Sequence, residues 1–155
     1  MRGAEALAMA DVVVFDRLSV GALLELAPLA AEQISVAKSA GQAVMAQDDI
    51  NELLIEKARQ GKTVVRLKGG DPFVFARGGE EAAALAAAGI HYEVVPGVTS
   101  AIAVPAYAGI PVTLRHSSTS FTVITGHEDP DKGDEVNWEA AAQLGGTIII
   151  LMGVG

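Results

Sequence analysis

Cysteine is absent from this 155-residue sequence, and histidine occurs only three times. The lack of cysteine excludes a disulfide framework, a thiolate metal site and a cysteine nucleophile. The histidines, His91, His116 and His127, do not have the spacing of metal ligands. We therefore expect no resident metal ion.

Long hydrophobic runs are also missing. Runs such as TIIILM at residues 147–152 are far too short to span a bilayer, and Glu5 and Asp11 interrupt the stretch where a signal peptide would need an apolar core. The formal net charge of -8 argues against general nucleic-acid binding, because phosphate neutralisation needs a basic face. These absences favour a soluble, cytoplasmic protein that binds neither nucleic acid nor membrane.

What the sequence contains is an alternation of apolar, β-branched runs with alanine-rich helical patterns. This alternation predicts an α/β fold, with an open parallel sheet and helices on both faces. Asp48 is a candidate N-cap for one of the helices. The predicted strands are residues 10–16, 33–38, 62–68 and 91–97, and the predicted helices are residues 20–30, 48–61, 79–89 and 99–109.

The texture changes after about residue 115. Strands are predicted at residues 121–126 and 147–153, with a short helix that begins at Trp138. Two strands and one short helix cannot bury a core of their own. We expect residues 1–115 to form an N-terminal α/β domain, and residues 116–155 to be a linker and the start of a second α/β domain.

Polar residues follow four of the predicted strands. They are Asp16, Lys38, the run Gly69-Gly70-Asp71, and Thr99 with Ser100. Ligands of open parallel sheets bind at the carboxyl ends of the strands, so these side chains should lie along one rim. The sequence therefore predicts a binding site at this edge.

Each of these residues also has a plainer interpretation. Asp16 could be a general base or a helix cap, and Lys38 could contact an anion or be an ordinary surface lysine. Thr99 is expected to cap the helix that follows it. Gly69 and Gly70 permit close approach of a ligand to the backbone, but a simple strand-to-helix turn would use glycines too. The glycine order fits neither a phosphate loop nor a dinucleotide fingerprint.

Longer motifs resemble one family. VVRLKGGDPFVFARGGEE at residues 64–81 and VVPGVTSAIAVPAYAGIPVT at residues 94–113 are similar to the uroporphyrinogen-III C-methyltransferase group of the tetrapyrrole methylases. ADVVVFDRL before them, and FTVITGHEDP and ILMGV after them, fit the same family in the same order. The resemblance covers the whole chain, as an internal piece that lacks the family's first strand and most of its second domain.

The resemblance implies methyl transfer from S-adenosylmethionine to carbons two and seven of uroporphyrinogen III, giving precorrin-2 for sirohaem and cobalamin synthesis. Asp16 matches the family's proposed proton acceptor, and Lys38 its proposed proton donor. A homodimer is also implied. The cofactor contacts would be Gly69, Gly70, Asp71, Val74, Thr99, Ser100 and Met152. The substrate carries carboxylates, for which the candidate cations besides Lys38 are Arg17, Arg77 and Arg115.

Three alternatives stay open at this point. Another precorrin methyltransferase of the same family would share these motifs. A binding or assembly module could keep the fold without catalysis. A nicotinamide-dependent oxidoreductase is the third alternative, and the glycine order counts against it.

Overall fold

The computed structural model describes residues 1–16, 21–37, 45–127 and 136–153, which group into two compact units. Unit 1 is Met1–Gly97 and unit 2 is Val98–Gly155. The domain boundary expected at residues 115 and 116 stays a prediction. In the described part of the chain, no helix is both long and apolar enough to cross a membrane.

Unit 1 contains a three-stranded parallel sheet in the order β2-β1-β3. The central strand β1 (Val12–Phe15) lies between β2 (Glu32–Ser35) and β3 (Val64–Leu67). Its first three residues, all valine, are completely buried. A strand covered on both faces needs a continuous apolar run rather than an alternating one, and this explains the VVVF sequence. The predicted parallel sheet is confirmed.

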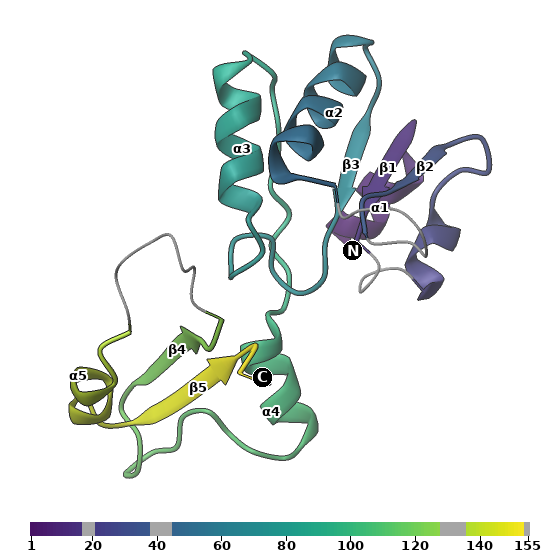
Figure 1. Cartoon of the computed structure of the whole chain (residues 1–155). Coiled ribbons are helices and arrows are strands. Elements are labelled where there is room, and N and C mark those ends of the chain that lie inside the picture. The colour runs from purple at the N-terminus through teal and green to yellow at the C-terminus, as the bar shows by residue number, and fades with distance from the viewer. Residues whose placement is uncertain (17–20, 38–44, 128–135, 154–155) are drawn as a thin grey trace. The chain divides into compact units, whose positions relative to one another are not determined.

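Helices cover both faces of this sheet. On one face, α2 (Gln47–Arg59) and α3 (Gly78–Ala87) surround a core of the even-numbered residues of β1 and β3. On the other face, α1 (Arg2–Ala8) and the 3-10 helix η2 (Gly21–Leu26) pack on the odd-numbered residues. Figure 1 shows α2 side by side with α3, and α2 also lies next to β3. Side chains alternate between the faces of a strand, so each face receives its own core.

The structure corrects several predicted elements of unit 1. The helix predicted at residues 20–30 is only the short η2, and α1 was not predicted at all. Ala46, not Asp48, is the N-cap of α2. Residues 91–97 do not form the predicted fourth strand. A strand needs a hydrogen-bonded neighbour, and in the described residues β3 is paired with β1 alone.

Unit 2 begins with α4 (Ser100–Tyr107) and contains a second parallel sheet of two strands. β4 (Phe121–Thr125) and β5 (Thr147–Leu151) pair in register along their full length. The short helix α5 (Trp138–Gln143) lies in the connection between them. The predicted elements of this region are confirmed, with slightly shorter bounds. They are the helices predicted at residues 99–109 and from Trp138, and the strands predicted at residues 121–126 and 147–153.

Candidate functional site

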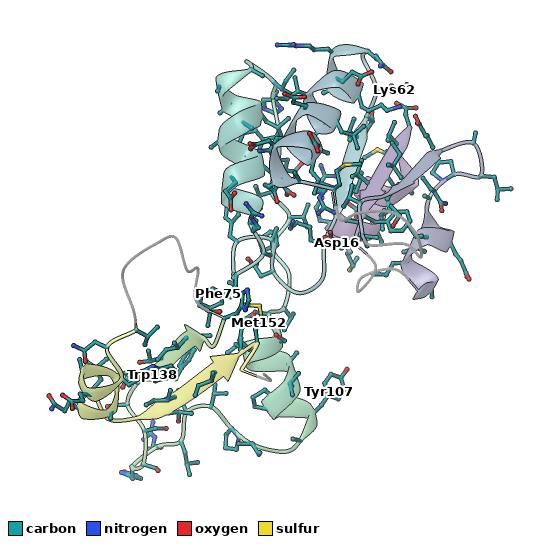
Figure 2. All side chains as sticks on the ribbon, in the orientation of Figure 1. Asp16, Lys62, Phe75, Tyr107, Trp138 and Met152 are labelled. Carbon is teal, nitrogen blue, oxygen red and sulfur yellow. The ribbon has the colours of Figure 1, made fainter. Side chains whose placement is uncertain are left out.

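The carboxyl ends of the parallel strands in unit 1 meet at one edge of the sheet. Asp16 directly follows β1, and the Gly69-Gly70-Asp71 run comes just after β3. Figure 2 shows Asp16 and Lys62 at opposite ends of this sheet, because Lys62 precedes β3. Two of the four predicted groups of polar residues therefore share an edge, as expected.

Asp16 is held by Arg66, which is not among the site residues predicted from the sequence. The Nη2 of Arg66 lies 2.9 Å from Oδ1 and 2.8 Å from Oδ2 of Asp16, and donates to both oxygens. The Asp16 side chain stays 37% exposed, whereas that of Arg66 is only 12% exposed. Arg66 is in register with Val14 of β1, so its side chain extends over the face that α2 and α3 cover.

A buried carboxylate on α3 holds the other end of this arginine. Glu81 Oε1 accepts from Arg66 Nε at 3.0 Å and from Lys68 Nζ at 3.1 Å. Gln47 Nε2, at the start of α2, lies 3.4 Å from the same oxygen. Glu81 and Lys68 are both less than a tenth exposed. A buried charge needs a partner, so these residues form one interconnected ionic cluster.

The sequence did carry a signal for this cluster. Arg66 interrupts the apolar run VVRL of a buried strand, and a charge in such a place must find an opposite charge nearby. The opposite charge is Glu81, which lies in the first turn of α3. Its burial was not visible, because that depends on how α3 packs on the sheet.

The loop after β3 is closed by the side chain of Asp71. Oδ1 accepts from the backbone N–H of Phe73 at 2.9 Å, and Oδ2 accepts from that of Gly97 at 3.0 Å. Gly70 has a φ of 68°, which favours glycine. A β-carbon on Gly97 would overlap the carbonyl oxygen of Gly70. Asp71 therefore fastens this loop to the end of the segment at residues 91–97.

Glycines in this loop serve two different purposes. A β-carbon on Gly78 would overlap the carbonyl oxygen of Pro72, so Gly78 allows the loop to fold back on itself. Gly69 and Gly70, by contrast, are exposed to solvent. Their bare backbone is open to a ligand, whereas Gly78 and Gly97 are needed for contacts within the protein.

Arg77, a predicted substrate contact, lies in the same loop. It has a φ of 57°, and its guanidinium donates to both carboxylate oxygens of Glu80, at 2.8 and 2.6 Å. These hydrogen bonds lower the pKa of Glu80. Both side chains are more than half exposed, so this surface pair can exchange its partners at little cost. Val74, a predicted cofactor contact, also belongs to this loop and is half-buried.

A groove of about 1070 Å³ in unit 1 runs along β3. It is lined by α1, β3, the start of α3 and residues 91–97, and it reaches Gly70, Pro72 and Phe73 in the loop. Mostly apolar walls with a few polar groups are typical of small-molecule sites.

Unit 2 contains the other predicted contacts. Thr99 is the N-cap of α4, as expected, and its hydroxyl accepts from the N–H of Ala101 at 3.3 Å. Ser100 is the first residue of that helix. Met152 directly follows β5, has a φ of 57° and is exposed. Arg115 is exposed in a turn between Leu114 and Ser118.

Lys38 and Arg17 lie outside the described residues, so their predicted roles stay predictions.

Comparison with known sequences decides the family. The profile described as Tetrapyrrole (Corrin/Porphyrin) Methylases matches residues 1–155. The chain belongs to the tetrapyrrole methylases. It is 60% identical over 146 residues to an S-adenosyl-L-methionine-dependent uroporphyrinogen III methyltransferase of Methanosarcina barkeri. It is 54% identical over 154 residues to a uroporphyrinogen-III C-methyltransferase of Methanocaldococcus jannaschii.

Solved tetrapyrrole methylases share the fold. The uroporphyrin-III C-methyl transferase of Thermus thermophilus complexed with S-adenosylhomocysteine matches with a TM-score of 0.78 and 39% identity, over 99% of this chain and 63% of that one. The chain covers 57% of the Methanosarcina protein and 63% of the Methanocaldococcus protein, while 94% and 99% of the chain itself is matched. It thus spans about three-fifths of the length of these relatives.

Proposed function

We propose that this tetrapyrrole methylase transfers methyl groups from S-adenosylmethionine to carbons two and seven of uroporphyrinogen III, giving precorrin-2. The observation that carries the proposal is the 60% identity to a protein named for the S-adenosylmethionine-dependent methylation of this substrate. Proteins named siroheme synthase are also similar, at 49% identity over 99% of this chain, which supports a role in sirohaem synthesis. Cobalamin synthesis would draw on the same product.

The proposed chemistry needs positioning and a base. S-adenosylmethionine supplies a methyl group on a positively charged sulfur, and the accepting ring carbon must be held in line with it. A ring proton must then leave. The carboxylate of Asp16, at the edge of the sheet and partly open to solvent, is the base that we propose. Lys38 is the proposed proton donor.

The cofactor contacts remain those expected from the motifs. The exposed backbone of Gly69 and Gly70 fits close approach by a ligand, and the adjoining groove is large enough for a molecule of this size. Asp71 already accepts two backbone hydrogen bonds, but an ionised carboxylate has further acceptor sites. We propose Val74 as an apolar contact. The proposed contacts from unit 2 are Thr99, Ser100 and Met152.

An acidic protein that binds a polycarboxylate must supply local cations. We propose Arg17, Arg77 and Arg115 for this role, in addition to Lys38. The Arg77 pair with Glu80 would open at modest cost, since both side chains are exposed. A homodimer and a cytoplasmic location are further parts of the proposal.

A second function is supported by another structural neighbour. Cobalt precorrin-4 methyltransferase matches with a TM-score of 0.80 and 27% identity, over 98% of this chain. Methylation of a precorrin is therefore the alternative reaction. The higher identity to the uroporphyrinogen III enzymes favours the first proposal. Cofactor binding without turnover would indicate a binding or assembly role.

The test is to incubate the protein with S-adenosylmethionine and either uroporphyrinogen III or a precorrin, followed by mass spectrometry. We expect two methyl additions to uroporphyrinogen III. Turnover of the precorrin alone would replace the first proposal by the second. Calorimetry with S-adenosylhomocysteine, on the parent, Asp71→Ala and the exposed control Asp48→Ala, tests the cofactor site separately. Binding should be lost only in Asp71→Ala.

Asp16→Asn tests the proposed base. The substitution keeps the size of the side chain but removes its charge, and kcat should fall about 10²- to 10⁴-fold. The affinity for S-adenosylhomocysteine should not change. Equal turnover by variant and parent would remove Asp16 from the mechanism.

A further inference from the structure

We propose that Arg66 is a positioning residue, which holds the carboxylate of Asp16 in one orientation for proton removal. This inference rests on the proposed function. Arg66 itself would not touch the substrate. The role follows from the hydrogen bonds of its guanidinium, which has one partner at the open edge of the sheet and another in the buried ionic cluster.

Every nitrogen of the Arg66 guanidinium has an acceptor within unit 1. Nη2 donates to both oxygens of Asp16, Nε donates to Glu81, and Nη1 lies 3.4 Å from the carbonyl of Val14 and 3.2 Å from that of Leu67. A planar group with acceptors on all three nitrogens has little freedom to rotate. The direction from which Nη2 approaches Asp16 is thereby fixed.

Glu81 and Lys68 hold Arg66 in place from its buried side. Arg66 alone beside Asp16 could follow a moving carboxylate out to solvent, but its Nε is bound to a carboxylate that is almost completely buried on α3. Lys68 binds the same oxygen of Glu81 and supplies a second positive charge. The anchor therefore belongs to the helix and sheet core rather than to the loop.

The contact with Arg66 orients Asp16 without covering it. An ionised carboxylate has about four acceptor positions, and Nη2 occupies two of them. The exposed part of the side chain leaves the other positions accessible from the edge of the sheet. A base must be both well placed and reachable, and this geometry satisfies both conditions.

A role for Arg66 in binding substrate carboxylates fits the structure less well. Its side chain is nearly buried, and its nitrogens already have acceptors. A purely structural role is the stronger competitor, because the same contacts would also stabilise the fold. The test must therefore separate the effect on Asp16 from an effect on stability.

The decisive experiment is a double-mutant cycle in kcat with the whole chain. Arg66→Lys keeps the charge but loses the fork of donors, and a misplaced base should lower kcat about 10- to 100-fold. KM for S-adenosylmethionine should not change. In the Asp16→Asn background the same substitution should have almost no further effect, because the base is already gone. Arg59→Lys, on the exposed side of α2, is the matched control and should leave kcat at the parent value.

An equal loss of kcat on adding Arg66→Lys to the parent and to Asp16→Asn would overturn the proposal and indicate a structural role. A parent without turnover would instead contradict the proposed function. In that event, NMR spectra of the arginine side chains test the positioning itself. The Nε and Nη signals of Arg66 should be protected from exchange with water and should shift in Asp16→Asn. Signals that stay unchanged in that variant would overturn the positioning role, whatever the activity.

Discussion

Replacing Glu81 with glutamine should destabilise unit 1 far more than the position of Glu81 in the sequence suggests. The Glu81 carboxylate lies 3.0 Å from Arg66 Nε and 3.1 Å from Lys68 Nζ, and all three side chains are nearly buried. Glutamine keeps the shape and an acceptor oxygen but removes the negative charge. Two buried cations would then have lost their shared counter-charge. Breaking a buried ion pair in this way costs about 3–5 kcal/mol.

Urea unfolding followed by far-ultraviolet circular dichroism measures this cost. With a dependence on urea of about 1–3 kcal/mol per molar, a loss of about 3 kcal/mol moves the midpoint by about 1–3 M. Glu80→Gln is the matched control, since it is the same substitution one residue earlier on α3. Glu80 pairs with Arg77 on the surface, where an ion pair contributes about 0–1 kcal/mol.

Equal midpoints for Glu81→Gln and Glu80→Gln would refute the reasoning, because burial would then make no difference to the ion pair. Lys68→Met gives a second check. When Lys68→Met is combined with Glu81→Gln, the free energy of unfolding should fall by less than the sum of the falls in the two single variants. The reason is that the double variant no longer buries an unpaired ammonium. Strict additivity would mean that the two side chains do not interact.

Two further predictions concern the loop and the response to acid. Gly97→Ala should lower the affinity for S-adenosylhomocysteine, because the new methyl group overlaps the carbonyl of Gly70; Gly79→Ala, where the space is open, should bind normally in calorimetry. Hydrogen bonds from Lys57 lower the pKa of Glu32. The stabilisation from Glu32 is therefore present above its unfolded pKa of about 4.3 and lost as the pH falls through the lower folded value. We expect the melting temperature to fall less between neutral and acidic pH in Glu32→Gln than in the parent. Equal falls in melting temperature would contradict the assignment of this stabilisation to Glu32.

Local sequence patterns determined most of the fold. The apolar runs of β1, β3, β4 and β5 each form a strand that pairs with a neighbouring strand. The amphipathic pattern at residues 48–61 forms α2 almost to its ends. These elements depend on side-chain periodicity and on local caps, both of which are visible within a few residues. The pattern at residues 91–97 is equally apolar, but the prediction of a strand was wrong.

The failure at residues 91–97 and the missed Arg66 have the same cause. A strand exists only if another strand donates and accepts its hydrogen bonds, and no local pattern contains that partner. In the same way, Arg66 is 50 residues from Asp16 and 15 residues from Glu81 along the chain. By contrast, the sequence did predict that Asp16 and the Gly69-Gly70-Asp71 run lie at the carboxyl ends of parallel strands.

The sequence by itself thus determined the family, most of the strand-and-helix pattern and the edge of the sheet where the site should lie. Only the tertiary structure decided which charges meet there. Burial makes a salt bridge strong or weak, and burial is a property of packed elements rather than of a residue type. For that reason Glu80 and Glu81, adjacent in the sequence, have opposite surroundings: Glu80 pairs with an arginine on the surface, and Glu81 anchors the arginine that holds Asp16.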